Sequence, residues 1–587
     1  MNRWVVLPVL LPVLLGIASL PLVPRVRACG RVISVGLVAN LGLCLWLLNA
    51  VASAPDAVSA VLSSQMGGWA APLGISLVAD ATSSMLLAST ALVAFCGHLY
   101  AVAALPETLQ RRYFHPLFAF LVAGVNLSFL TGDLFNLFVA FEVMLMASYG
   151  LVVLGGGRVQ LAQAYKYVLL NLLASTLFVT GAGLVYGMFG TLNVADLCRT
   201  FLEPGFEPPA GFAAVSVTLL IVFALKAGAF PLWFWLPDVY PSLPTPTLAV
   251  FGGVLTKVGV YALARLFPAV FGANHAADAI GPLLGLTAGA TMLVPALMAV
   301  AYPRMRMVLC MMILTGVGFA LAGIAVGSAD ALAGTVFYCV QSMLVVSVAF
   351  LLCGRLEAAA GTDRFRGGRV PGGLHRGHPW LAVGLLAILL ALVGLPPLSG
   401  FYGKLLIVQE ALGTGHPVLG VVALLTGAVT LLAVLRAWAG VFWVFPEAEE
   451  PAEAAAGPVP PAPARCGWHR AVAVALLLVA AGWMSLAPEP ALALAKRAGA
   501  GLAEPTAYVR AVLPADPAVI DVAPVPPPKI GKPTAEAYGK HGSSPDPAAS
   551  AHAGEHADAT HAAAAPPPRS HHTGEGTTPR SSAGGTK

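Results

Sequence analysis

The sequence is poor in charged residues. Only 10% of its 587 residues are Asp, Glu, Lys or Arg, against roughly 25% in an average soluble domain, whereas 58% are hydrophobic. Such a chain cannot cover its apolar surface in water, which argues against a soluble enzyme and a nucleic-acid-binding protein. The eight cysteines form no CxxC pair, and no nucleotide-binding glycine motif or haem ligand pair is found. We therefore expect no cofactor and no metal site.

Long apolar runs fill most of the chain and predict an all-α polytopic membrane protein. A run of about 20 apolar residues can cross a bilayer as a helix, and the sequence offers about 14 such runs. They lie near 3–23, 32–53, 77–104, 114–131, 133–155, 163–189, 211–236, 243–267, 279–301, 305–327, 330–354, 379–413, 417–445 and 470–488. The first run is followed by no small-residue cleavage site, so we expect a retained helix rather than a signal peptide.

The distribution of arginine predicts the orientation. Arg25, Arg111 and Arg304 belong to one set of alternate connections, whereas the opposite set, such as 54–76 and 414–417, holds almost no Lys or Arg. Because basic loops stay on the cytoplasmic side, both termini are expected on the non-cytoplasmic side. From about residue 514 the composition changes to Pro, Ala, Gly, Ser, Thr and His, which predicts a disordered tail over 514–587.

Charged residues inside the apolar runs are the main candidates for function. A charge at the bilayer centre costs about 2.5–3.5 kcal/mol on insertion scales, so each one needs a reason to be there. The central four are Glu142, Lys226, Lys257 and Lys404. A structural ion pair or a polar anchor to a neighbouring subunit is the alternative to a transport role. The others are nearer to helix ends, where we expect interfacial or snorkelling side chains; they are Asp80, Asp133, Lys166, Asp238, Arg265, Glu410 and Arg436.

Two of the central lysines lie beside helix breakers. Lys226 is in FALKAGAFPLWFWLPD, which contains Pro231, and Lys404 follows the Pro396–Pro397 pair in VGLPPLSGFYGK. Broken helices in corresponding positions of two halves are typical of a transporter's ion pathway. They belong to the seventh and twelfth predicted spans, and because this offset is odd, a five-helix repeat would be inverted across the membrane.

Lysine and glutamate suit proton transfer. A buried lysine or glutamate binds and releases a proton closer to neutral pH than an exposed one, and an opposite charge nearby reverses that effect. Opening or closing a contact between Glu142 and Lys226 would therefore change a proton affinity. A row of such residues forms a proton relay where water connects them.

Three motifs carry a resemblance to a known family. LTGDLFNLFVAFEVMLMASYGL (130–151), FALKAGAFPLWFWLPDVYPSLPTPTLAVFGGVLTKVGVYAL (223–263) and LVGLPPLSGFYGKLLI (392–407) resemble the antiporter-like subunits shared by Mrp-type multisubunit cation/proton antiporters, respiratory complex I and membrane-bound hydrogenases. The resemblance covers roughly 70–445. Within the family the chain is most similar to the D-type subunit of Mrp (Mnh, Pha) antiporters, through its length, the stretch LRAWAGVFW (435–443) and the ending EPTAYVRAVL (504–513).

The resemblance implies a fold with two inverted five-helix repeats and a central axis of charged residues. By motif, Glu142 is the fifth-helix glutamate, Lys226 the seventh-helix lysine that pairs with it, Lys257 the connecting lysine and Lys404 the terminal lysine. Asp238 is then a helix-end or loop contact. The implied organisation is a three-helix region (1–110), a first repeat (111–267), a second repeat (278–445), a linker with the last helix and C-terminal motif (446–513), and the tail (514–587).

One stretch departs from the family pattern. Relatives carry HHxxxK in the eleventh helix, whereas this chain reads YCVQSMLVVSVAF over 338–350, with Gln341 and Ser342 at the histidine positions and Val346 at the lysine position. Neither Gln nor Ser titrates, and valine carries no proton. A relay from Lys257 to Lys404 would need water held by polar side chains, for which the candidates are Gln341, Ser342, Ser347 and Thr315.

The leading hypothesis is a proton-translocating subunit of a multisubunit Na⁺ or other monovalent cation/proton antiporter in the bacterial inner membrane, and not an enzyme. Its implied partners are an A-type large subunit and small membrane subunits, with protons and monovalent cations as the transported ions. The alternatives are a proton-pumping subunit of a complex I-like or hydrogenase redox complex, and a non-conducting scaffold subunit.

Overall fold

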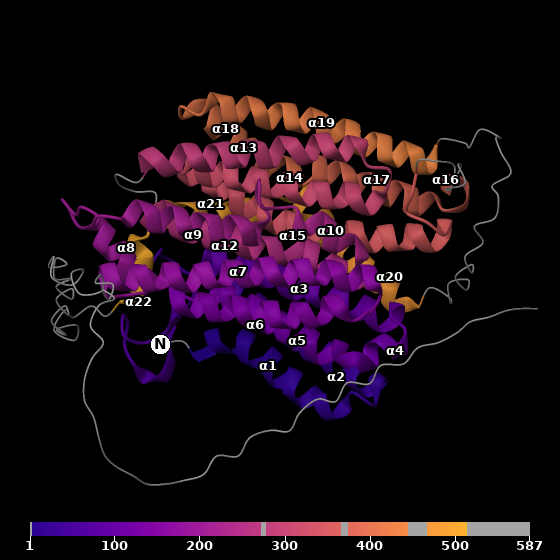
Figure 1. The fold of residues 1–587 in the computed structure, drawn as a ribbon, viewed down its shortest axis with the longest axis horizontal. Coiled ribbons are helices and arrows are strands. Elements are labelled where there is room, and N and C mark those ends of the chain that lie inside the picture. Colours follow the sequence, from indigo (N-terminus) through magenta and orange to yellow (C-terminus); the bar gives the residue numbers. More distant parts are fainter. Residues whose placement is uncertain (1–2, 272–276, 366–373, 444–466, 514–587) are drawn as a thin grey trace, which may run out of the picture. The chain divides into compact units, whose positions relative to one another are not determined.

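The computed structural model describes residues 3–271, 277–365, 374–443 and 467–513. Its described part is mostly helical, and most helices run side by side (Figure 1). The predicted linker at 446–466 and the predicted disordered tail at 514–587 lie outside the described residues.

Twelve of the described helices are long and apolar enough to cross a membrane. In the order of the chain they are built from α1 (Leu7–Ser19), α2 (Val26–Ala52), α3 (Ala81–Ala104), α5 (His115–Leu130), α6 (Leu134–Val153), α7 (Arg158–Phe189), α11 (Thr245–Val250) with α12 (Thr256–Leu266), α13 (Ala277–Ala301), α14 (Met305–Val326), α15 (Ala329–Ala360), α19 (Pro417–Phe442) and α20 (Trp468–Leu486). The predicted class of polytopic helical membrane protein is confirmed. The number of crossings and the inverted repeats stay predictions.

Two shorter apolar helices end at the predicted breaks. Helix α9 (Phe212–Ala227) ends at Gly228, and after a non-helical stretch containing Pro231 the chain resumes as α10 (Trp235–Val239). Helix α17 (Pro379–Val393) ends at Gly394, and α18 (Gly400–Gly413) follows the Pro396–Pro397 pair. Both glycines have a positive φ, of 78° and 89°, which other L-residues rarely adopt. Glycine and proline together therefore define both interruptions.

Several short elements were not predicted from the sequence. Strands β1 (Leu62–Gln65) and β2 (Ser76–Ala79) pair antiparallel; β1 lies in the predicted connection 54–76, whereas most of β2 replaces the start of the helical run predicted over 77–104. The other short helices are α4 (Glu107–Leu109), α8 (Val194–Leu202), α16 (Leu374–Gly377), α21 (Glu489–Ala503) and α22 (Thr506–Val512). Helix α22 packs against α8 and β1, and its end is fixed by Ser63 Oγ, which donates to the Ala511 carbonyl at 3.0 Å. The C-terminal motif therefore closes over the β1–β2 hairpin.

Helices α12 and α15 form the buried interior. The apolar windows that contain them are buried along their whole length, whereas α1, α2 and α20 leave most of theirs exposed. Helix α15 packs against α3, α11, α14, α17, α18, α20 and α21. In Figure 1 it lies between the edge formed by α1 and α2 and the edge formed by α13 and α19. The exposed apolar helices fit a lipid or subunit environment, and one of the charged candidates, Lys257, lies on α12.

Close backbone contact between helices depends on glycine. At Gly124 of α5 an added Cβ would lie 2.5 Å from the backbone nitrogen of Met144 in α6, closer than real Cβ atoms approach. At Gly183 of α7 it would meet nothing within 4 Å. The same Gly→Ala substitution at the two positions therefore isolates the effect of helix packing.

We expect Gly124→Ala to destabilise the protein by about 1–3 kcal/mol, because α5 and α6 must separate to admit the methyl group. Gly183→Ala, the control, should leave stability unchanged or slightly higher, since alanine favours helix. The midpoint of thermal unfolding in detergent measures both. Equal midpoints for the two variants would contradict this account of the α5–α6 contact.

Candidate functional site

Lys226 lies in the last turn of α9 and is buried. Its Nζ donates to Ser175 Oγ at 3.1 Å and to the Asn171 carbonyl at 3.4 Å, both on α7. The ammonium also lies 5.7 Å from the centre of the Phe141 ring. These partners are neutral, so they solvate the lysine without fixing its charge.

Glu142 follows Phe141 on α6 and is partly buried. Among the described residues no ion pair within 4.0 Å joins Glu142 to Lys226, so the direct pairing implied by the resemblance is not formed in this structure. Glu142 Oε1 is buried and makes no hydrogen bond to a described residue. The carboxylate thus keeps a free acceptor.

Lys257 lies in the first turn of α12, directly after an irregular part of the backbone. Its Nζ donates to the Gly252 carbonyl at 3.3 Å, within a π-helical turn (Phe251–Leu255) that joins α11 to α12. Across from this turn, Ser347 Oγ of α15 donates to the carbonyls of Ala249, at 2.9 Å, and Met343, at 2.7 Å. Ser347 therefore fixes α15 against the helix that leads to Lys257.

Lys404 of α18 is held by the end of the broken helix α17. Its Nζ donates to the carbonyls of Leu392, at 2.9 Å, and Val393, at 2.8 Å, in the last turn of α17. Carbonyls in a last turn have no partner within their own helix and carry partial negative charge. The ammonium also lies 4.3 Å from the ring centre of Phe319 and 5.6 Å from that of Tyr338. Lys404 is thus stabilised by carbonyls and aromatic faces.

The residues at the departure from the family pattern lie beside Lys404. Gln341 Nε2 donates to the Ala391 carbonyl at 3.4 Å, one residue before the carbonyls that hold Lys404. Ser342 is buried on the same helix as Tyr338, whose ring lies 5.6 Å from the Lys404 ammonium. Val346 is buried and apolar. The amide of Gln341 therefore reaches from α15 to the end of α17 that holds Lys404. Val346, on the same helix, offers no polar group.

Polar atoms without a hydrogen-bond partner occur along the same region. Four of those in the described part of the chain are Glu142 Oε1, Thr256 Oγ1, Thr315 Oγ1 and Gln341 Oε1. Thr256 precedes Lys257, and Gln341 is the residue that reaches the helix holding Lys404. Buried polar atoms of this kind are costly unless water binds them. Sites of water binding are what a relay between the lysines requires.

One pair of charges near helix ends departs from the sequence-based expectation. Asp80 and Arg265 do not snorkel: they form a buried ion pair, with Arg265 Nη1 2.6 Å from Asp80 Oδ2, because they meet across α3 and α12. Lys166 and Asp238 form an exposed pair at 3.0 Å, which makes Asp238 the helix contact expected of it.

The other three end charges have local partners. Asp133 caps α6 by accepting from the Asn136 amide at 2.8 Å. Glu410 accepts from Ser328 Oγ at 2.6 Å. Arg436 donates to the Val300 carbonyl at 2.6 Å. Each therefore stabilises a helix end or a helix contact.

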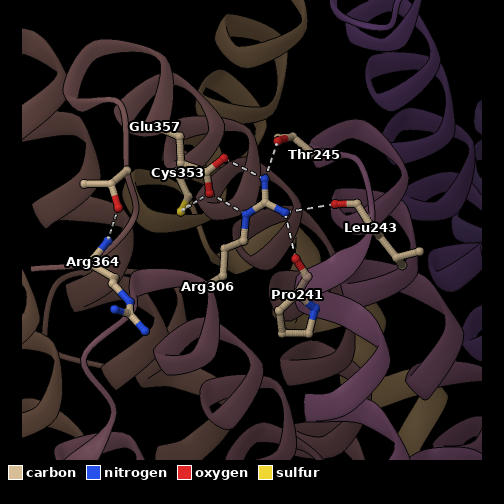
Figure 2. Close-up of polar contacts among 8 residues, drawn as sticks. Pro241, Leu243, Thr245, Arg306, Cys353, Glu357 and Arg364 are labelled. Atoms are coloured by element: carbon tan, nitrogen blue, oxygen red, sulfur yellow. Dashed lines mark hydrogen bonds and ion pairs between the residues drawn. The ribbon is translucent and has the colours of Figure 1, made fainter. Parts of the chain in front are cut away.

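Arg306 of α14 connects the segment after the first broken helix to α15 (Figure 2). Its Nε and Nη2 contact the two carboxylate oxygens of Glu357. Nη1 donates to the carbonyls of Pro241, at 3.0 Å, and Leu243, at 2.9 Å, and Nη2 also donates to Thr245 Oγ1 at 3.0 Å. All five N–H groups of the guanidinium are thereby used. We call this group of contacts, from Arg306 to Glu357, Pro241, Leu243 and Thr245, the Arg306 clamp. The clamp fixes the start of α11, which leads to Lys257.

Some of these contacts had a signal in the sequence and others had none. Asn171 and Ser175 interrupt an apolar run at a spacing of four, which places them on one face of α7 and could have identified the partners of Lys226. The clamp at Arg306 joins positions that are 51 and more than 60 residues apart. Only the folded chain shows it.

The part of the chain that holds the central charges matches a known family. Residues 131–430 match the family model described as NADH:quinone oxidoreductase/Mrp antiporter, transmembrane. The chain therefore belongs to this family of multi-pass membrane subunits, as the three motifs predicted.

Within the family the similarity is to named antiporter components. The D-type subunit of the Na⁺/H⁺ antiporter of Alkalihalophilus pseudofirmus is 38% identical over 76% of this chain and 87% of that protein, and its counterpart of the same name in Bacillus subtilis is 35% identical over the same shares. A chain in the structure of the Mrp complex from Dietzia sp. superposes with a TM-score of 0.76 and 29% identity, covering 88% of this chain and 100% of that chain. A chain of respiratory complex I from Thermus thermophilus gives a TM-score of 0.69 and 27% identity, covering 85% and 99%. These relatives are components of membrane complexes, and the expected similarity to the D-type subunit is confirmed.

Removing the clamp should weaken the fold. We expect Arg306→Ala to lower the free energy of unfolding by about 3 kcal/mol, because Glu357 and the carbonyls of Pro241 and Leu243 lose their donor. Arg364→Ala is the matched control, since Arg364 is exposed and its backbone, rather than its side chain, makes the bond drawn in Figure 2. Unfolding midpoints in detergent measure both variants. A midpoint for Arg306→Ala as high as that of the control would contradict the structural role.

Proposed function

We propose that the chain is the proton-translocating subunit of a multisubunit monovalent cation (Na⁺)/proton antiporter, and that protons move along Glu142, Lys226, Lys257 and Lys404. Membership of the family and the similarity to D-type subunits of Na⁺/H⁺ antiporters support the role in an antiporter. External protons exchange for internal sodium or another monovalent cation. An A-type large subunit and small membrane subunits are the proposed partners, and both termini face the non-cytoplasmic side of the inner membrane.

One observation carries the proposal for the path. Within the described residues, none of the three central lysines forms an ion pair with a carboxylate. Each is held by neutral groups: a hydroxyl and a carbonyl at Lys226, a carbonyl at Lys257, and two carbonyls at Lys404. A structural lysine in a membrane protein would be expected to have a carboxylate partner, because a lone buried charge is costly. A lysine surrounded by neutral groups can lose its proton and remain in place.

The contacts suggest how a proton is passed on. Ser175 accepts from the Lys226 ammonium and can donate back to the neutral amine, because a hydroxyl serves in both directions. In the proposed path, proton release from Lys226 depends on the charge of Glu142, whose Oε1 makes no hydrogen bond to a described residue. Water bound at Thr256, Thr315 and Gln341 would continue the path toward Lys404. Val346 contributes no polar group, so the part of the path along α15 has the fewest side chains that can bind water.

Lysine replacement tests the path. We expect Lys226→Ala and Lys404→Ala to reduce cation-dependent proton flux at least tenfold, while Lys496→Ala, an exposed lysine 3.8 Å from Asp330, leaves it unchanged. Flux is measured by the cation-induced dequenching of a pH-sensitive dye in inverted vesicles from antiporter-deficient cells that express the whole complex. Equal assembly is verified by copurification of the partner subunits. Flux that survives in both lysine variants would favour the scaffold alternative, for which the apolar Val346 is the supporting observation.

Gln341 tests the link on α15. Gln341→Leu keeps the approximate volume but removes the amide that reaches the end of α17, so we expect a several-fold loss of flux with normal assembly. Val346→Leu, an apolar exchange on the same helix, should retain the wild-type rate. The same vesicle assay compares them, and an unchanged rate for Gln341→Leu would remove Gln341 from the path.

A further inference from the structure

A second charged group, separate from the central lysines, is buried between α3, α12 and α22. Asp80 caps α3 through the Ser83 amide and binds Arg265 of α12 at 2.6 Å. The guanidinium lies 5.3 Å from the ring centre of Tyr261 and 5.1 Å from that of Tyr508. Arg265 is buried, and its Nε makes no hydrogen bond to a described residue. The cation is thus enclosed by one carboxylate and two aromatic rings.

Two of these partners also form the wall of a cavity. The cavity has a volume of about 340 Å³ and is lined by Asp80 and Tyr508 together with Asp56, Arg497 and Glu504. Arg265 is not among the lining residues; it lies directly behind Asp80 and Tyr508. The cavity is polar enough to hold water and lies beside the segment that leads into β1. The Asp80–Arg265 pair therefore links the wall of the cavity to α12.

Helix α12 connects this pair to the central axis. Lys257, Tyr261 and Arg265 are spaced by four residues and share one face of the helix. Two turns, a rise of about 12 Å, separate Lys257 from Arg265. Between them the Tyr261 hydroxyl donates to the Phe129 carbonyl at 2.8 Å and accepts from Arg265 Nη2 at 3.4 Å. A polar face therefore runs from the cavity wall toward Lys257.

We propose that Arg265 is an insulating residue, which separates the lysine axis from the cavity and prevents protons from crossing between them. This inference rests on the proposed proton path. A carboxylate such as Asp80 can take a proton from water in the cavity, but a guanidinium does not give up its proton in a protein. It therefore cannot pass a proton inward. A fixed positive group at a constriction also repels hydronium and metal cations.

The C-terminal motif has a role in this barrier. Tyr508 belongs to EPTAYVRAVL, and α22 is held in place by Ser63 and Gln65 of β1, which donate to the carbonyls of Ala511 and Val512. An added Cβ at Gly132 would lie 2.8 Å from the Tyr508 hydroxyl. The glycine at this position therefore leaves room for the Tyr508 side chain. The segment therefore places an aromatic ring over the guanidinium on the cavity side.

The experiment measures passive proton leak. The assembled complex is reconstituted into liposomes, and the decay of an imposed pH gradient is followed in choline medium without sodium or potassium. The main variant is Asp80→Asn/Arg265→Met, which removes both charges and leaves no unpaired buried ion. We expect its leak to be at least fivefold faster than wild type. Asp80→Asn alone keeps the guanidinium, so its proton leak should be as slow as that of the wild type. Lys496→Ala should also leak at the wild-type rate.

A third variant traces the route of the leak. Adding Lys257→Ala to the double variant should restore a slow decay, because the leak passes through the lysine axis. The inference is overturned if the assembled double variant is as tight as wild type, if Asp80→Asn leaks equally, or if Lys257→Ala does not suppress the leak. If Lys257→Ala alone abolishes cation-dependent flux while the double variant stays tight, only the barrier fails. If Lys257→Ala alone leaves that flux intact, the proposed path fails.

Discussion

A lysine ammonium in a membrane interior needs hydrogen-bond acceptors, and a regular helix offers few because its carbonyls already bind its own amides. The backbone of this protein is irregular beside each central lysine. Lys404 binds the free carbonyls at the end of α17, Lys257 binds a carbonyl in a π-helical turn, and Lys226 occupies the last turn of α9. The breaks at glycine and proline are therefore part of how the charges are tolerated.

The two broken helices carry their lysines in different surroundings. Lys226 has a hydroxyl partner, and in the proposed path its charge responds to that of Glu142, a second titratable group. Lys404 has carbonyls and aromatic faces around it. The first position is thus suited to receive a signal from another charge, and the second to hold or release a proton in isolation. Gln341 of α15 couples to the second position through a hydrogen bond to the end of α17 rather than through charge.

The features predicted from the sequence are those with a local signal. A lysine within an apolar run, or a proline beside it, is visible in a window of twenty residues, and the central charges and both breaks were identified in that way. The Asp80–Arg265 pair was misinterpreted because its partners are 185 residues apart and each looks interfacial alone. The strands β1 and β2 are too short for a periodic pattern. The missing Glu142–Lys226 contact depends on side-chain placement, which sequence patterns do not determine.

The clamp at Arg306 has a consequence for the kind of motion that transport can use. It ties α14, α15 and the segment at 241–245 together through bonds that occupy every donor of one guanidinium. These elements belong to both predicted repeats, so the repeats cannot rock past one another without breaking the clamp. Transporters built from inverted repeats alternate their access largely by moving one repeat or bundle against the other. The architecture favours a rigid scaffold in which only side chains, protons and water change position.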